Sequence, residues 1–247
     1  MIKDYDNNYH QLLNRKKYTF GVLYQKGGQT TEQEIFANVE HCDKFEQFLQ
    51  LLGSFELKSE YDNLGYYTKR HEDLDFRFYV LTRLPYSETD SQQCFRKARI
   101  GNCVLSIVFQ ADEATFCPEI ITSQFLHVYV VIQPLASGKI KENRTGKNKT
   151  LITKITDQYK IRVVTKSGVP NFGPTIDSIE IINRETFGKF LTLLVNAEQA
   201  AYNTGKLSDL RKKYRIAGLS QISQKMAADQ LQKEVFSDGA KWKCALL

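Results

Sequence analysis

The stretch Tyr18-Thr-Phe-Gly-Val-Leu-Tyr-Gln25 is followed within a few residues by Gly27-Gly28 and then by Thr31-x-x-Glu34. Its first part is rich in aromatic and β-branched residues and predicts a strand that ends at the glycine pair. The threonine and the glutamate three residues later form a capping-box pattern, which is typical of a helix start. A strand that passes almost directly into a helix indicates an α/β protein.

Other segments predict more strands and helices. A second helix is predicted between Asp43, which can cap it, and Gly53, which suits a helix C-terminus. Its apolar residues recur at helical spacing: Phe45, Phe48, Leu49 and Leu52. Four apolar or alternating segments predict strands of one sheet: Asp75 to Leu81, Cys103 to Phe109, Phe125 to Gln133 and Tyr159 to Thr165. An amphipathic helix is predicted from Phe187 to Glu198, followed by polar helical patterns at 206–216 and 220–236. The predicted fold class is α/β, with a central mixed β-sheet flanked by helices.

Composition limits the class of protein. Of 247 residues, 42% are hydrophobic and 12% aromatic, which is enough apolar material for a folded core. The longest strongly apolar stretch, about Phe125 to Leu135, is too short to cross a bilayer. The N-terminus lacks the apolar core of a signal peptide. We therefore expect a cytoplasmic protein with reduced thiols.

The sequence offers no pattern for a metal or a cofactor. Its five cysteines form no CxxC pair, and its four histidines are far apart in the sequence. Gly146-Lys-Asn-Lys-Thr150 resembles the end of a phosphate-binding loop, but the required earlier glycine is missing. Motifs of serine hydrolases and zinc proteases are missing too. We expect no metal, no cofactor and no nucleotide site in this chain.

The net charge of +6 is concentrated in two segments. Lys139 to Lys149 carries +4 and the chain from Lys206 onward carries +5, which leaves −3 for the remainder. Neither segment interleaves aromatic residues with its cations, as sites for single-stranded nucleic acid do. Nucleic-acid binding is therefore the least favoured interpretation. The two segments fit solvated loops or an anionic membrane surface better.

A polar helix is predicted between Pro85, which stops a strand, and Gly101. Ser87 or Thr89 can cap its N-terminus. Few of its residues suit a core: Cys94, Phe95, Ala98 and Ile100. We expect most of this helix to be exposed and open to a partner.

Three cations lie near the C-terminal end of this helix, where the helix dipole favours them: Arg96, Lys97 and Arg99. From spacing alone, Asn102 after Gly101 is an ordinary left-handed turn residue.

The string Arg96-Lys-Ala-Arg-Ile-Gly-Asn102 resembles the Lys-Arg-His-Ile-Gly-Asn-Asp signature of the Rap/Ran-GAP family, the GTPase-activating domains that act on Rap-type and related small GTPases. Six further blocks resemble those of the family, in the same order: Tyr24-Gln-Lys-Gly-Gly-Gln-Thr30, Phe45-x-x-Phe-Leu-x-Leu-Leu-Gly53, Leu84-Pro-Tyr86, Phe125-Leu-His-Val128, Val169-Pro-Asn-Phe-Gly-Pro174 and Asn196-Ala-Glu198. The resemblance runs from about Tyr18 to about Tyr214.

The resemblance implies a function. The family is known for an asparagine thumb, whose carboxamide reaches into the GTPase and orients the attacking water; Asn102 matches it. Such an amide both donates and accepts hydrogen bonds. Lys97 matches a signature lysine and is expected to contact the partner, as are Arg99 and Lys26. The expected partner is a GTP-bound small GTPase of Rap, Ral or Rheb type, which brings the nucleotide.

Three positions differ from the family signature. Ala98, Arg99 and Cys103 replace an arginine, a histidine and an aspartate. These differences favour an alternative function, a GTPase-binding adaptor with weak or no catalysis. The sequence leaves both functions open.

The C-terminus carries an independent pattern. Cys244-Ala-Leu-Leu247 is a CaaX box of the geranylgeranyl type, which predicts prenylation of Cys244 and anchoring on the cytosolic face of a membrane. The expected organisation is an N-terminal extension at 1–17, a Rap/Ran-GAP-like domain at 18–216, and a C-terminal helix and tail at 217–247.

Overall fold

A computed structural model describes residues 17–59, 64–112, 114–135, 158–174, 179–181, 186–205, 207–210 and 213. The basic loop at 139–149, the helical pattern at 220–236 and Cys244 lie outside these residues, as does part of the pattern at 206–216. The domain boundaries expected from the sequence fall at or next to undescribed residues and stay predictions.

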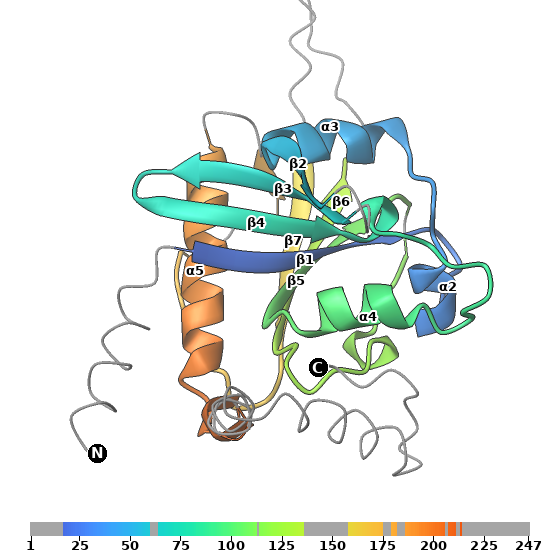
Figure 1. Ribbon diagram of the computed structural model, residues 1–247. Coiled ribbons are helices and arrows are strands. Elements are labelled where there is room, and N and C mark those ends of the chain that lie inside the picture. The colour runs from blue at the N-terminus through green and yellow to red at the C-terminus, as the bar shows by residue number, and fades with distance from the viewer. Residues whose placement is uncertain are drawn as a thin grey trace, which may run out of the picture.

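The described strands form one mixed sheet (Figure 1). Its eight strands lie in the order β2-β3-β4-β1-β5-β6-β7-β8. They are β1 (Lys17–Gln25), β2 (Ser54–Ser59), β3 (Leu64–His71), β4 (Leu74–Val80), β5 (Leu105–Gln110), β6 (Val128–Pro134), β7 (Gln158–Thr165) and β8 (Ile179–Ile181). The central strands β4, β1, β5 and β6 run parallel, and antiparallel pairs complete both sides.

Side chains of the central strands alternate between two hydrophobic clusters. On β1, Phe20 and Val22 point to one cluster, whereas Leu23 belongs to the other. Successive strand residues face opposite sides of a sheet. Both sides are covered here, so β5 is buried along its whole length and β6 along its first five residues.

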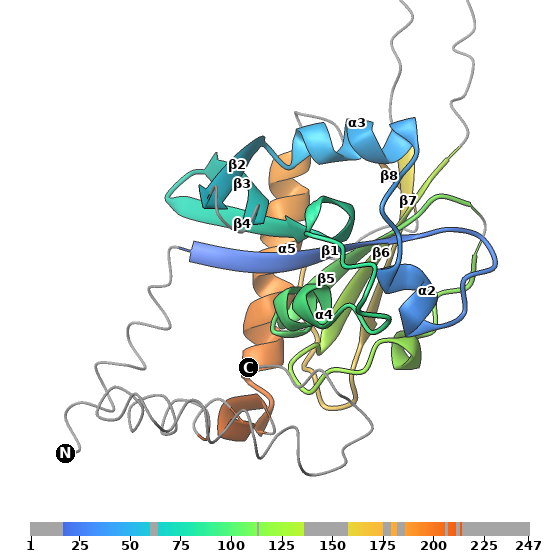
Figure 2. The same cartoon turned by 45° about the vertical axis from the view of Figure 1, so that its right-hand side comes forward.

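Helices cover the two faces, as the two views show (Figures 1 and 2). The helices α3 (Asp43–Leu51) and α5 (Phe187–Tyr202) pack on the larger cluster. The short helix α2 (Glu32–Phe36) and α4 (Cys94–Gly101) pack on the other. Two 3₁₀ turns, η1 (Leu81–Arg83) and η2 (Pro118–Ile120), lie in the connections. The result is a three-layer α/β/α arrangement.

The capping box predicted at the start of α2 is present. The Thr31 hydroxyl accepts a hydrogen bond from the Glu34 N–H, and the Glu34 carboxylate accepts one from the Thr31 N–H. For α3 the predicted cap is wrong by one residue. Cys42 occupies the cap position, and Asp43 lies in the first turn.

A glycine on β1 allows α4 to lie close to the sheet. A Cβ atom at Gly21 would come within 2.5 Å of the Ser106 hydroxyl oxygen and 3.0 Å of Ile100 Cγ2. Ile100 is the fully buried apolar residue of α4. The position of the helix therefore depends on this glycine.

The fold class predicted from the sequence is confirmed. The predicted strands correspond to β1, β4, β5, β6 and β7, and the helix predicted from Phe187 is α5, which continues to Tyr202. The sequence did not predict β2, β3 or β8. Within the described residues, no helix is both long enough and apolar enough to cross a membrane.

Candidate functional site

Helix α4 is attached to its surroundings by a buried arginine. Arg96 leaves only 1% of its surface exposed. Its guanidinium donates hydrogen bonds of 2.8–3.1 Å to four backbone carbonyl oxygens, those of Phe36, Asn38, Leu84 and Pro85. Burial lowers the pKa of Arg96, but a guanidinium stays charged in proteins. These bonds fix α4 to the chain after α2 and after η1.

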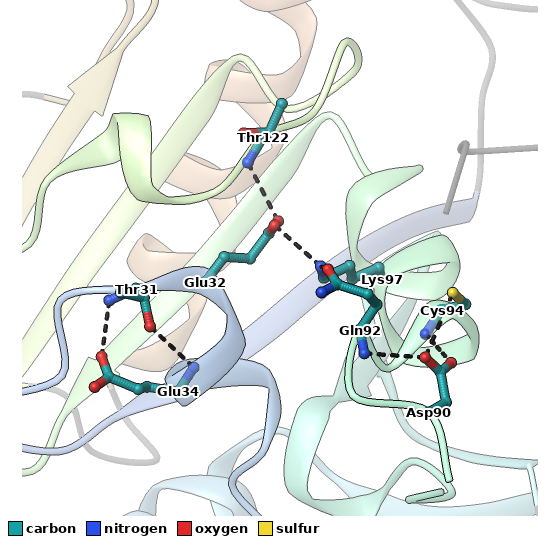
Figure 3. A network of polar contacts seen from close by, with 8 residues as sticks. All are labelled: Thr31, Glu32, Glu34, Asp90, Gln92, Cys94, Lys97 and Thr122. Carbon is teal, nitrogen blue, oxygen red and sulfur yellow. Dashed lines mark hydrogen bonds and ion pairs between the residues drawn. The ribbon is translucent and has the colours of Figure 1, made fainter. Parts of the chain in front are cut away.

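The next residue of α4 forms a buried ion pair (Figure 3). Lys97 Nζ lies 3.2 Å from Glu32 Oε2, and the two side chains are 5% and 9% exposed. Lys97 also donates to Gln92 Oε1 at 2.9 Å, and the Thr122 N–H donates to Glu32 Oε1 at 3.3 Å. Burial raises the pKa of Glu32, while Lys97 and the Thr122 bond act in the opposite direction. Glu32 thus joins α2, α4 and the loop after η2.

The start of α4 is organised by Asp90 (Figure 3). Its carboxylate accepts hydrogen bonds from the Cys94 N–H at 2.6 Å and the Gln92 N–H at 3.0 Å. Gln93 precedes the helix in a left-handed conformation, with φ 49° and ψ 51°. The sequence placed the cap at Ser87 or Thr89, which is too early because neither supplies this bond.

The end of α4 differs from the turn expected at Gly101 and Asn102. The helix includes Gly101, and Asn102 is its C-cap in the right-handed region, with φ −81° and ψ −7°. The Ser123 hydroxyl donates to the Gly101 carbonyl oxygen at 2.7 Å and accepts from the N–H groups of Phe125 and Leu126. The backbone that carries Asn102 is therefore fixed, while its side chain is exposed.

Asn102 lies beside a hollow of about 150 Å³. The lining residues come from α4, the starts of β1 and β5, the end of β4 and the C-terminal half of α5: Thr19, Tyr79, Ala98, Arg99, Asn102, Cys103, Val104, Glu198 and Tyr202. Glu198 is buried and accepts a hydrogen bond of 3.0 Å from the Tyr202 hydroxyl. The hollow offers one carboxylate, one guanidinium and several neutral hydrogen-bonding groups.

Arg99 is the half-buried cation of this hollow. Its Cζ lies 5.1 Å from the centre of the Phe95 ring, a cation–π distance. Burial raises the pKa of Tyr79, and the positive charge of Arg99 opposes this rise. Arg99 therefore contacts an aromatic ring on its own helix, and its charge acts on the Tyr79 hydroxyl of β4.

A protein-family model described as Rap/ran-GAP matches residues 35–216. This range covers more than half of the chain and includes α4 and all lining residues of the hollow except Thr19. The chain belongs to the Rap/ran-GAP family.

Two relatives and one solved structure illustrate the similarity. The chicken (Gallus gallus) protein "GTPase-activating Rap/Ran-GAP domain-like protein 3" is 30% identical over an alignment that covers 90% of this chain and 24% of that protein. Mouse (Mus musculus) "Signal-induced proliferation-associated 1-like protein 1" is 32% identical, covering 83% of this chain and 12% of that protein. The chain thus spans a quarter or less of these relatives.

A solved structure titled "Structure of the TSC2 GAP domain" has the same fold. Its TM-score is 0.59 at 28% identity, and the match covers 75% of this chain and 96% of that one. The fold of the Rap/ran-GAP family is therefore present in the described part of this chain.

Within this Rap/ran-GAP chain, two of the candidate residues meet in the hollow. Asn102 and Arg99 line it together. The prediction that α4 is mostly exposed is wrong, because Phe95 is the one exposed residue among Cys94–Gly101. Arg96 and Lys97 also lie before the last turn of α4, where the helix dipole was expected to favour them. Both are buried, and Lys97 is paired with Glu32, so its ammonium does not face a partner in this structure. Phe95, expected to suit a core, is 38% exposed.

Lys26 is exposed but lies away from the hollow. It follows the C-terminal end of β1, whereas the hollow includes Thr19 near the start of that strand. Seven residues at about 3.3 Å each separate the two positions by roughly 23 Å. The structure does not bring Lys26 together with Asn102.

Three residues that hold α4 were missed by sequence reasoning: Arg96, Glu32 and Ser123. Glu32 is the first residue of a five-residue helix, where a carboxylate is ordinarily explained by the helix dipole. The family resemblance covers Arg96, but spacing gave no sign that its partners lie 58 and 60 residues upstream.

Proposed function

We propose that this protein docks on a GTP-bound small GTPase and accelerates hydrolysis of its GTP, with the carboxamide of Asn102 as the group that enters the GTPase site. The observation that carries the proposal is an exposed asparagine at the end of α4. Three sets of contacts hold this helix in place: those of Arg96, the Lys97–Glu32 ion pair and the Ser123 hydrogen bond to Gly101. The name of the chicken relative, which refers to a GTPase-activating domain, supports it.

The physical argument concerns orientation of water. Intrinsic GTP hydrolysis is slow because the attacking water is poorly positioned and transition-state charge is poorly stabilised. A carboxamide can accept a hydrogen bond from the water while donating one to a neighbouring oxygen. Such a group contributes only when its position is fixed to within a fraction of an ångström. Arg96, the Lys97–Glu32 pair and Ser123 supply that positioning from inside this chain.

The adaptor alternative is also a proposal, and the replaced signature residues favour it. Ala98 and Cys103 line the hollow where the family has arginine and aspartate. An adaptor would bind the GTP form of its partner without changing the hydrolysis rate. Activator and adaptor therefore make opposite predictions in one experiment.

The experiment uses Rap-, Ral- and Rheb-type GTPases loaded with GTP or GDP. Binding of wild-type protein is measured for both nucleotide states, and hydrolysis is followed in a single turnover. The activator proposal predicts faster hydrolysis with at least one GTPase, lost in Asn102→Ala with binding retained. Asn203→Ala is the matched control, because Asn203 is likewise an exposed C-cap asparagine but does not line the hollow. Binding to the GTP form without acceleration would establish the adaptor instead.

Two further expectations remain proposals. Cys244 is proposed to be prenylated and to anchor the protein on the cytosolic face of a membrane. Intact-mass measurement of protein from eukaryotic cells, with Cys244→Ser as control, tests the modification. Lys26 is proposed to make a contact at the edge of the partner interface, and Lys26→Ala should then weaken GTPase binding without lowering the maximal rate.

A further inference from the structure

Arg99 differs from the other two cations of α4 in what it contacts. Arg96 donates to four carbonyl oxygens, and Lys97 pairs with Glu32 and Gln92. Arg99 contacts the Phe95 ring, and no salt bridge joins it to a carboxylate within the described part of the chain. A cation–π contact at a partly exposed site contributes only about 0.5–1 kcal/mol, so it is readily exchanged for an anion.

Arg99 also shares its surface with the proposed thumb. Positions three apart lie on one helix face with Cβ atoms about 5–6 Å apart. Arg99 and Asn102 have this spacing, and both line the hollow. Two side chains this close can contact the same small group on a docked partner.

We propose that Arg99 is a second catalytic group of this protein, binding the phosphate oxygens of the partner's GTP while Asn102 orients the water. The proposal rests on the proposed function, because it requires a docked GTPase. It assigns a role to a residue that replaces the family histidine. A guanidinium matches phosphate oxygens with two parallel N–H donors and remains charged, which an imidazole does not guarantee.

Arg99 neither gives nor takes a proton during hydrolysis of the partner's GTP. The oxygen of water bonds to the γ-phosphorus, and the bond from that phosphorus to the β–γ bridging oxygen breaks. The electron pair of the broken bond remains on GDP, and the protons of the water are retained by inorganic phosphate or released to solvent. Arg99 stays protonated throughout and stabilises charge on the oxygens as the bond breaks. An arginine in this role is worth about 10³–10⁵ in rate in other GTPases.

Three variants test the role, in single-turnover hydrolysis over a range of activator concentrations. Arg99→Ala is expected to lower the maximal rate at saturation by about 10²-fold or more, with a half-saturating concentration that changes little. Arg99→Lys keeps the charge without the planar fork and should recover only part of the rate. Arg99→His restores the family residue and should also remain below wild type. Arg70→Ala is the matched control, because Arg70 is an exposed arginine on β3.

A second readout separates catalysis from structure. Wild-type protein is expected to form a stable complex with the GDP-bound GTPase in the presence of aluminium fluoride, a planar mimic of the transferred phosphoryl group. Arg99→Ala should not, although its thermal midpoint stays close to that of wild type. If Arg99→Ala raises only the half-saturating concentration and keeps the maximal rate, Arg99 is a docking residue and the inference is wrong, while the proposed function stands. If wild-type protein accelerates no GTPase, the proposed activator function and this inference fall together.

Discussion

Replacement of Lys97 by methionine is predicted to destabilise the protein by about 3–5 kcal/mol at neutral pH, the usual cost of removing one member of a buried ion pair. Methionine keeps an unbranched apolar stem of similar length, so packing changes little. What it removes is the ammonium 3.2 Å from Glu32 Oε2. The Glu32 carboxylate then remains buried with the Thr122 N–H as a hydrogen-bond donor.

The destabilisation should depend on pH in a defined direction. Burial raises the pKa of Glu32, and Lys97 lowers it in part, so the variant should have a Glu32 pKa higher still. A carboxyl group with a folded-state pKa above its unfolded value, about 4.3 for glutamate, binds more protons when folded. Its stabilising contribution is present below the unfolded pKa and is lost as pH rises through the folded pKa. The cost of Lys97→Met should therefore be larger at pH 7 than at pH 5.

Urea unfolding at pH 5 and pH 7 measures this difference. Lys44→Met is the matched control on the exposed surface of α3 and should change stability by no more than about 0.5 kcal/mol. The double variant with Glu32→Gln removes the buried charge and should lose less stability than the sum of the two single variants. A Lys97→Met cost below about 1 kcal/mol, or an equal cost at both pH values, would refute the buried ion pair.

Three further predictions concern the position and surface of α4. Gly21→Ala should lower the free energy of unfolding by about 1–3 kcal/mol, because the added Cβ would meet Ser106 and Ile100. An unchanged midpoint in thermal or urea unfolding would contradict the close approach of α4 to β1. Ser106→Ala should stabilise the fold by about 1 kcal/mol, because the buried Ser106 hydroxyl oxygen has no hydrogen-bond partner among the described residues. A clear loss of stability in urea unfolding would show instead that this hydroxyl is hydrogen-bonded. Phe95→Ala should raise, by about tenfold, the concentration of this protein that half-saturates the acceleration of GTP hydrolysis, as expected for an exposed aromatic residue in an interface. An unchanged concentration would place Phe95 outside the interface.

The sequence predicted the centre of the sheet well because periodicity reports burial directly. β5 and β6 are mainly apolar and are buried on both faces, and β1 carries aromatic residues at alternate positions. The edge strand β2 was missed because its described side chains, Ser54 to Leu57, are all exposed. It is held by backbone pairing with β3 and by side-chain contacts with that strand, such as Phe55 against Tyr67, rather than by burial.

The site was predicted less completely because its supporting contacts join segments far apart in the chain. Asn102 and Arg99 could be found from a local string. The burial of Arg96 and Lys97 could not, because a polar helix taken alone looks exposed. Arg96 donates to carbonyl oxygens 58 and 60 residues away in the sequence, and Lys97 pairs with a glutamate on a different helix. Local patterns identify the groups that can react, whereas the tertiary structure determines which of them are available to a partner.

The central claim is that Asn102 acts on the hydrolytic step and not on docking. The most direct measurement is the single-turnover hydrolysis rate of the responsive GTPase at saturating activator, with the dissociation constant of each complex measured separately. We predict that Asn102→Ala lowers the saturated rate by about 10²-fold or more, the usual cost of losing one preorganised hydrogen-bonding group, while the dissociation constant changes less than about threefold. A saturated rate equal to that of wild type, or a loss fully explained by weaker binding, would contradict the account.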